Sequence, residues 1–147
     1  MFEPANLRVV ILDERNRIAD ALRDNLTGTG ILVDDGRNGA EALRLVRRCE
    51  PDIVLIHDAA QLESCWLSAC KLRISGWHGP IWICSNRLQH QPGWREGCEV
   101  DEVLFFHKVE EISAAIIQSV DGSRRARQQG LSDRNIQGQA TQLVSPV

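Results

Sequence analysis

The sequence contains no apolar run near the ~20 residues that a membrane-spanning helix requires. Its first eight residues also lack the long apolar stretch of a signal peptide. The five cysteines are odd in number and never spaced as CxxC, so neither a disulfide framework nor a zinc site is expected. We interpret them as small apolar residues of the interior; they are Cys49, Cys65, Cys70, Cys84 and Cys98. These absences predict a soluble, cytoplasmic protein without a membrane partner.

Charge is unevenly distributed along the chain, whose formal net charge is -3. Four arginines and two aspartates follow Val120, so this segment carries a charge of about +2 and the remainder about -5. A body with this negative charge does not suit a phosphate backbone, and we expect no nucleic-acid partner. The composition predicts a domain over residues 1–120 and an Arg/Gln-rich, disordered tail over residues 121–147.

Short apolar runs alternate with stretches of helical periodicity. The runs predict strands at Leu7–Leu12, Ile31–Val33, Asp52–His57, Ile81–Cys84 and Val103–Phe106. Helical spacing predicts helices at Ile18–Leu26, Asn38–Cys49, Leu62–Leu72 and Glu110–Val120, with Pro92–Gly93 shortening or breaking another. This alternation with short connections predicts an α/β fold, a doubly wound parallel sheet of five strands with helices on both faces.

Polar side chains stand where the predicted strands end. They are Asp13 and Glu14 after the first strand, His57 and Asp58 at the third, Ser85 after the fourth and Lys108 after the fifth. In an open parallel sheet, functional groups gather at the carboxyl ends of the strands. Carboxylates suit Mg²⁺, and a hydroxyl and an ammonium group suit phosphoryl oxygens. The sequence therefore predicts a site for a divalent cation and a phosphoryl group at this edge.

Five segments carry these residues in a characteristic order: LDERNRIADAL, GILVDDGRNGAEAL, PDIVLIH, PIWICS and LFFHK. Together they resemble the response-regulator receiver domain, the phospho-accepting module of two-component signalling and phosphorelays, over about Leu7–Val120. The resemblance implies a flavodoxin-like fold and a Mg²⁺ site at Asp13 and Glu14. It also implies phosphate contacts from Ser85 and Lys108, and a switch role for Phe105.

The chain departs from this family at the position that matters most for phosphoryl transfer. Where the family carries its acceptor aspartate, at the tip of the third strand, this chain has His57. An imidazole cannot form the acyl phosphate, and it is a poor ligand for Mg²⁺. Asp58 follows directly, but consecutive strand residues point to opposite sides of a sheet. Further departures are Gln61 and Val109, which replace two prolines of the family pattern.

Two main hypotheses follow. In the first, the chain is an atypical receiver, or pseudo-receiver, that is not an enzyme and acts by protein–protein interaction. In the alternative, Asp58 is the phospho-acceptor of an active, Mg²⁺-dependent receiver that catalyses its own phosphoryl transfer. A third class, a small flavodoxin-like enzyme or nucleotide binder, is disfavoured because no GxGxxG or Walker pattern follows a strand.

Each site residue also has a structural interpretation. Asp13 and Glu14 suit the start of the first helix, and Ser85 suits a hydrogen bond to the main chain. Lys108 suits an ion pair with one of the carboxylates at this edge, and Phe105 is equally compatible with the core.

The four tryptophans indicate where a partner would bind. Trp66 and Trp82 fit the core, whereas Trp77 and Trp94 fall in predicted loops and suggest a docking surface, since tryptophan is enriched at interfaces. The resemblance implies a histidine kinase or a downstream signalling protein as partner. It also allows a homodimer through the face formed by the fourth helix, fifth strand and fifth helix.

Overall fold

The structure is a computed structural model, and it describes residues 7–58, 64–87 and 93–122. Five strands alternate with helices along the chain, as predicted. They are β1 (Leu7–Leu12), α1 (Ala19–Asn25), β2 (Ile31–Gly36), α2 (Gly39–Cys49), β3 (Ile53–His57), α3 (Cys65–Ile74), β4 (Ile81–Ser85), α4 (Trp94–Gly97) and β5 (Glu102–Phe105). A further helix covers residues 109–122.

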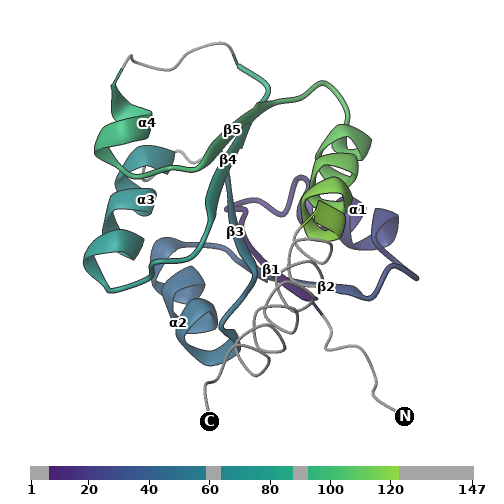
Figure 1. The fold of residues 1–147 in the computed structure, drawn as a ribbon, viewed down its shortest axis with the longest axis horizontal. Coiled ribbons are helices and arrows are strands. Elements are labelled where there is room, and N and C mark those ends of the chain that lie inside the picture. The colour runs from purple at the N-terminus through teal and green to yellow at the C-terminus, as the bar shows by residue number, and fades with distance from the viewer. Residues whose placement is uncertain (1–6, 59–63, 88–92, 123–147) are drawn as a thin grey trace, which may run out of the picture. The chain divides into compact units, whose positions relative to one another are not determined.

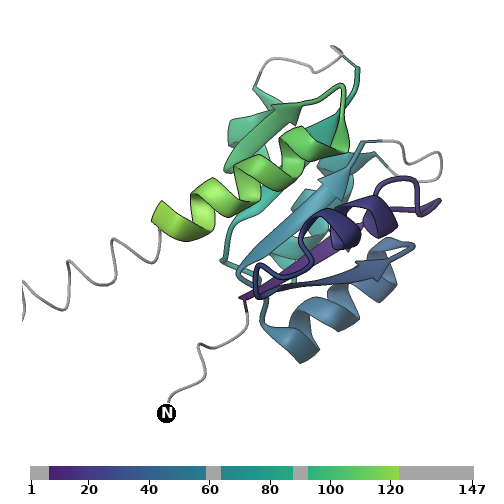
Figure 2. The same cartoon turned by 90° about the vertical axis from the view of Figure 1, so that its right-hand side faces the viewer.

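All five strands belong to one parallel sheet in the order β2-β1-β3-β4-β5. Helix α1 lies on one face of this sheet, and α2, α3 and α4 lie on the other (Figure 1). Figure 2 shows the dark-blue α1 in front of the strands. The predicted fold class, with helices on both faces of a doubly wound sheet, is therefore confirmed.

Strand alternation divides the interior into two sets of side chains. One set faces α2 and α3 and packs against apolar residues of these helices; it includes Val10, Leu12, Val54, Ile56, Ile81 and Ile83. Residues between them in the strands, such as Val9, Ile11 and Leu55, are equally buried. Because both sets are apolar, the strands read as continuous hydrophobic runs, which is why the sequence reveals them.

Hydrogen bonds from side chains define where the helices begin. Asn38 accepts the main-chain N–H of Glu41 at 2.9 Å and starts α2, as predicted, and Ser64 accepts that of Leu67 at 3.1 Å and starts α3. Helix α4 is only four residues long and begins after Gly93, whose φ is +87°. The expected short helix is thus found, although Pro92 and Leu62 lie outside the described residues.

The helical spacing of Ile18, Ala21, Leu22 and Leu26 predicts that these residues form the buried side of α1. For Ala21 this was wrong: it is exposed, and Ala19 is buried together with the other three. The helix begins at Ala19, one residue later than expected, and Asp13 accepts the main-chain N–H groups of Ile18 and Ala19 at this end.

The chain divides between Ser113 and Ala114 into two units. The first contains the sheet and helices α1 to α4. Of the second, residues 114–122 are described and helical, with Ile116 and Val120 buried. The predicted tail from residue 123 onward lies outside the described residues. No helix in the described part is long and apolar enough to cross a membrane.

Candidate functional site

The carboxyl ends of the strands bring most of the predicted polar residues to one edge of the sheet. The register pairs Leu12 with Ile56 and His57 with Cys84, so the residues that end β1, β3 and β4 are neighbours. Contacts then divide these residues into two groups, one around Asp13 and one around Asp58.

Asp13 is buried, with 1% of its surface exposed, and both of its carboxylate oxygens are bonded. Oδ2 accepts the main-chain N–H groups of Ile18 at 2.8 Å and Ala19 at 2.9 Å. Oδ1 lies 3.3 Å from Nδ1 of His57. Burial raises the pKa of the Asp13 carboxyl, but the hydrogen bonds from His57 and the main chain outweigh it and lower the pKa to about 2. Asp13 is therefore an anion that caps α1, which agrees with its structural interpretation.

His57 is buried at the end of β3, beside Asp13. Because the Asp13 carboxylate only accepts hydrogen bonds, Nδ1 carries the proton and donates it. The imidazole also lies against Phe106, with ring centroids 5.8 Å apart and planes at 51°. Within the described part of the chain, Nε2 is buried and has no hydrogen-bond partner. The imidazole is thus an internal donor to Asp13 rather than a group facing solvent.

Asp58 contacts a different set of residues, as strand alternation predicts. Its Oδ2 lies 3.1 Å from the hydroxyl of Ser85, which also accepts the N–H of Arg87 at 3.0 Å. Cys65, at the start of α3, is a further neighbour of Asp58. Burial and the negative charge of Asp58 raise the pKa of the Cys65 thiol to about 12, so this thiol stays protonated. Asp58 therefore belongs to the side of the sheet that carries α3.

Lys108 and Phe105 do not complete the expected constellation. Lys108 is exposed, and within the described residues its ammonium group makes no ion pair with Asp13 or Asp58. Phe105 is 43% exposed, so the interpretation as a core aromatic was wrong for this residue. The buried aromatic is the next residue, Phe106, which the sequence analysis overlooked although it closes the same strand run.

The donor set at this edge does not fit Mg²⁺. Among the described residues, no three His, Cys, Asp or Glu side chains form a group that would hold a metal ion. Both oxygens of Asp13 are bonded within the protein, and the neighbour to Oδ1 is an imidazole. Mg²⁺ prefers hard oxygen ligands in near-octahedral geometry. Glu14, the next residue along the chain, is half-buried.

The tryptophans are arranged only partly as expected. Trp66 and Trp82 are buried, which confirms their place in the core. Trp94 is 40% exposed and packs edge-to-face on Trp66, with centroids 6.0 Å apart and planes at 79°. Trp77 is half-buried and packs against the core cluster formed by the sheet, α2 and α3. Of the two proposed docking residues, only Trp94 presents a large exposed surface.

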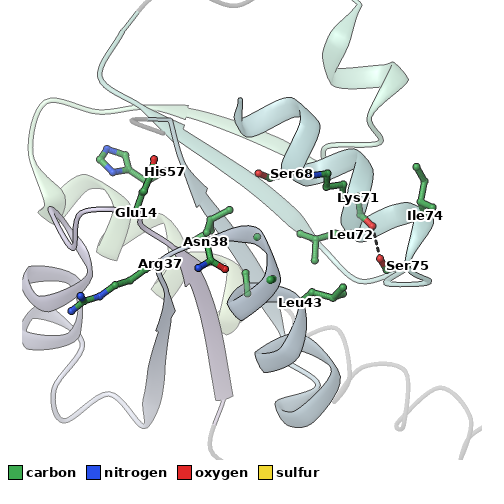
Figure 3. A pocket seen from close by; sticks show the side chains of 14 residues that line it. Glu14, Arg37, Asn38, Leu43, His57, Ser68, Lys71, Leu72, Ile74 and Ser75 are labelled. Carbon is green, nitrogen blue, oxygen red and sulfur yellow. Dashed lines mark hydrogen bonds between the residues drawn. The ribbon is translucent and has the colours of Figure 1, made fainter. Parts of the chain in front are cut away.

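A cavity of about 590 Å³ lies between α2 and α3, and the sequence analysis missed it. Its walls include Leu12, Leu43 and Leu72, and small residues at the start of α2 leave the space open. Glu14 and His57 also line this cavity, and Figure 3 shows the imidazole of His57 pointing away from Leu43 and Leu72. The cavity therefore reaches the residues at the ends of β1 and β3.

No protein-family model matches the sequence, and no curated protein matches it. Solved structures do match. The chemotaxis protein CheY4 of Vibrio cholerae has a TM-score of 0.67 and 15% identity over 78% of this chain and 98% of that one. A CheY-like receiver domain protein of Methanospirillum hungatei has a TM-score of 0.69 and 12% identity, covering 82% and 98%. The response regulator TrrA of Thermotoga maritima, solved with Mg²⁺ and BeF, has a TM-score of 0.64 and 18% identity, covering 76% and 97%. The chain therefore has the fold of the response-regulator receiver domains.

Proposed function

We propose that this chain is an atypical receiver of two-component signalling that acts by contact with other proteins and takes up no phosphoryl group at its strand-edge site. The observation that supports this most directly is the pair formed by His57 and Asp13. The imidazole occupies the end of β3, where the resemblance expects the acceptor carboxylate, and it is bonded to the one buried acid beside it.

The chemistry of phosphoryl transfer explains why this replacement matters. An acceptor aspartate attacks through a carboxylate oxygen, and a metal ion balances the charge that gathers at the transferred group. TrrA was solved with Mg²⁺ and BeF. Here the His57 N–H already occupies Oδ1 of Asp13, and α1 occupies Oδ2. Among the residues described at the ends of β1 and β3, His57 stands at the acceptor position and the Asp13 carboxylate has both oxygens bonded.

We propose a histidine kinase or a downstream signalling protein as the partner. A homodimer through the surface around α4 and β5 is a further form of the same contact-based function. The exposed rings of Trp94 and Phe105 support a protein partner at this surface, since aromatic residues are enriched at interfaces.

A second candidate has one observation in its favour. The carboxylate of Asp58 lies 3.1 Å from the hydroxyl of Ser85, which occupies the position where the resemblance implies a phosphate contact. In this alternative, Asp58 accepts the phosphoryl group. The contacts of Asp58 on the α3 side, without Lys108 or Asp13 among them, make it the weaker proposal.

One experiment separates the two candidates. The full chain is incubated with Mg²⁺ and acetyl phosphate, and its intact mass is recorded; a receiver domain that carries an aspartate at this strand end serves as the control for the donor. We expect no change in mass for the wild type. A gain of one phosphate that disappears in Asp58→Asn would overturn the proposal and establish the alternative. In His57→Asp, a gain of one phosphate would show that this single replacement silences the site.

A further inference from the structure

Two cysteines that are far apart in the sequence meet between α3 and α4. Cys70 lies in α3, and Cys98 follows directly after α4, 28 positions further along the chain. Their Sγ atoms are 2.8 Å apart, and both thiols are free and only partly buried. The remaining described cysteines differ: Cys65 and Cys84 are fully buried, and Cys49 lies on α2.

The neighbouring residues hold these two thiols in place. Arg73, one turn after Cys70, donates from Nε and Nη2 to the carbonyl of Glu99 at 3.2 and 2.7 Å. Nη2 also reaches Oδ2 of Asp101 at 3.1 Å. The main chain just after Cys98 is therefore held to α3. The sulfur atoms meet where these two segments are held together.

The contact between Trp66 and Trp94 supports the same arrangement from the other end of α4. Trp66 lies one turn before Cys70 in α3, and Trp94 is the first residue of α4. Helix α4 thus packs against α3 at both of its ends. A covalent bond between Cys70 and Cys98 requires the sulfur atoms to approach from 2.8 Å to roughly 2.0 Å, which is a small movement.

We propose that Cys70 and Cys98 form a redox-sensitive pair, which a hydroperoxide converts into an intramolecular disulfide bond between α3 and the end of α4. The sulfur of one cysteine attacks hydrogen peroxide, the O–O bond breaks, and a sulfenic acid and one water form. The second thiol then attacks that sulfur and the S–O bond breaks. The hydroxyl group leaves with the proton of this thiol as a second water. Two thiols and one peroxide thus give one disulfide and two waters.

Burial, together with the neighbouring Cys70, raises the pKa of the Cys98 thiol to about 11, so this thiol is protonated at neutral pH and is a weak nucleophile. We therefore expect the pair to react with peroxide slowly. The inference does not depend on the proposed signalling function, because it uses neither His57 nor Asp58. It concerns how firmly α4, with its exposed Trp94, is attached to the rest of the domain.

The test is oxidation of the full folded chain with hydrogen peroxide, followed by peptide mapping without reduction. We expect a loss of two thiols, one cross-linked peptide pair containing Cys70 and Cys98, and full return of both thiols with dithiothreitol. Cys70→Ser and Cys98→Ser should each abolish the cross-link, whereas Cys49→Ser, the matched control, should retain it. Oxidation should also raise Tm by several degrees and increase the protection of the α4 amides from hydrogen exchange.

The unfolded chain supplies the decisive comparison and does not depend on how the variants fold. In urea, all five cysteines are free to pair, and mixed cross-links are expected. If the folded wild type gives the same mixture as the unfolded chain, the proposal is overturned. Separate overoxidation of Cys70 and Cys98 to sulfinic acids, with no bond between them, would overturn it equally.

Discussion

Substitution of Asp13 by asparagine tests the central contact of the candidate site. The side chain keeps its shape but loses its charge. In the wild type, the carboxylate accepts two N–H groups at the start of α1 and one from His57. All three donors are stronger partners of an anion than of a neutral amide. We expect Asp13→Asn to fold and to be less stable at neutral pH.

The magnitude follows from the lowered pKa of this carboxyl. Its pKa falls from the ordinary value of 3.8 to about 2 in the folded chain, which corresponds to about 2 kcal/mol of unfolding free energy at neutral pH. Because the folded state has the lower pKa, this stabilisation is complete above pH 4. It is lost as the pH falls from 3.8 toward 2. The difference between wild type and Asp13→Asn should shrink over the same range.

Urea unfolding at pH 7 and at several values down to pH 3 measures this difference. For an m-value of about 2 kcal/mol per molar urea, the midpoint at pH 7 should move by about 1 M. Asp20→Asn is the matched control, since Asp20 lies on α1 with an exposed side chain that pairs only with surface groups such as Arg23. An Asp13→Asn variant as stable as Asp20→Asn at pH 7, or a difference that stays constant down to pH 3, would refute the reasoning.

Three further substitutions test the packing around the site. In Gly36→Ala, the new Cβ would lie 2.8 Å from the main-chain nitrogen of Ala42, so we expect the unfolding free energy measured in urea to fall by about 1–3 kcal/mol. The control Gly97→Ala, where the space is open, should be close to wild type. Asn38→Ala removes the cap of α2 and should lower the unfolding free energy by about 1 kcal/mol in the same assay. Arg73→Gln removes the charged donors to several main-chain carbonyls and should lower the unfolding free energy by about 2 kcal/mol. It should also reduce the yield of the peroxide-induced cross-link, and an unchanged yield would contradict the role given to this residue.

Much of the fold could be predicted because the information is local. The strands are short runs of apolar residues, and their boundaries in the structure differ from the expected ones by one residue in β3, β4 and β5. Strand β2 extends further than predicted, to Gly36. The prediction stopped at Val33 because Asp34 and Asp35 are polar and do not resemble a buried strand, whereas β2 lies at the edge of the sheet. The cap of α2 at Asn38 was equally visible, since it depends on residues three apart.

The site was harder to predict because its contacts depend on which side of a strand each residue faces. Alternation correctly separates His57 from Asp58, but it cannot tell that the imidazole reaches Asp13. The sequence is compatible with a core position for Phe105, but Phe105 is exposed and Phe106 is buried. The reason is that β5 ends at Phe105, so strand alternation does not hold beyond it.

The contact between Cys70 and Cys98 could not be predicted from the sequence for a related reason. A separation of 28 positions matches no local motif, and the five cysteines look alike as small apolar residues. Their difference arises only when α3 and α4 pack together and Arg73 fixes the turn after Cys98.

The contacts of His57 explain how a receiver fold accommodates an imidazole at the end of β3. A carboxylate at this position would place two negative charges in one buried site, which requires a cation or a shared proton between them. In this chain, the N–H of His57 satisfies one oxygen of Asp13, and the start of α1 satisfies the other. The Asp13 carboxylate is then stabilised by hydrogen bonds within the protein, while Asp58 is held by Ser85 on the α3 side. We propose that the contact between His57 and Asp13 stands where a phosphorylated receiver needs an acceptor and a metal ion, and the contact-based function proposed above rests on this contact.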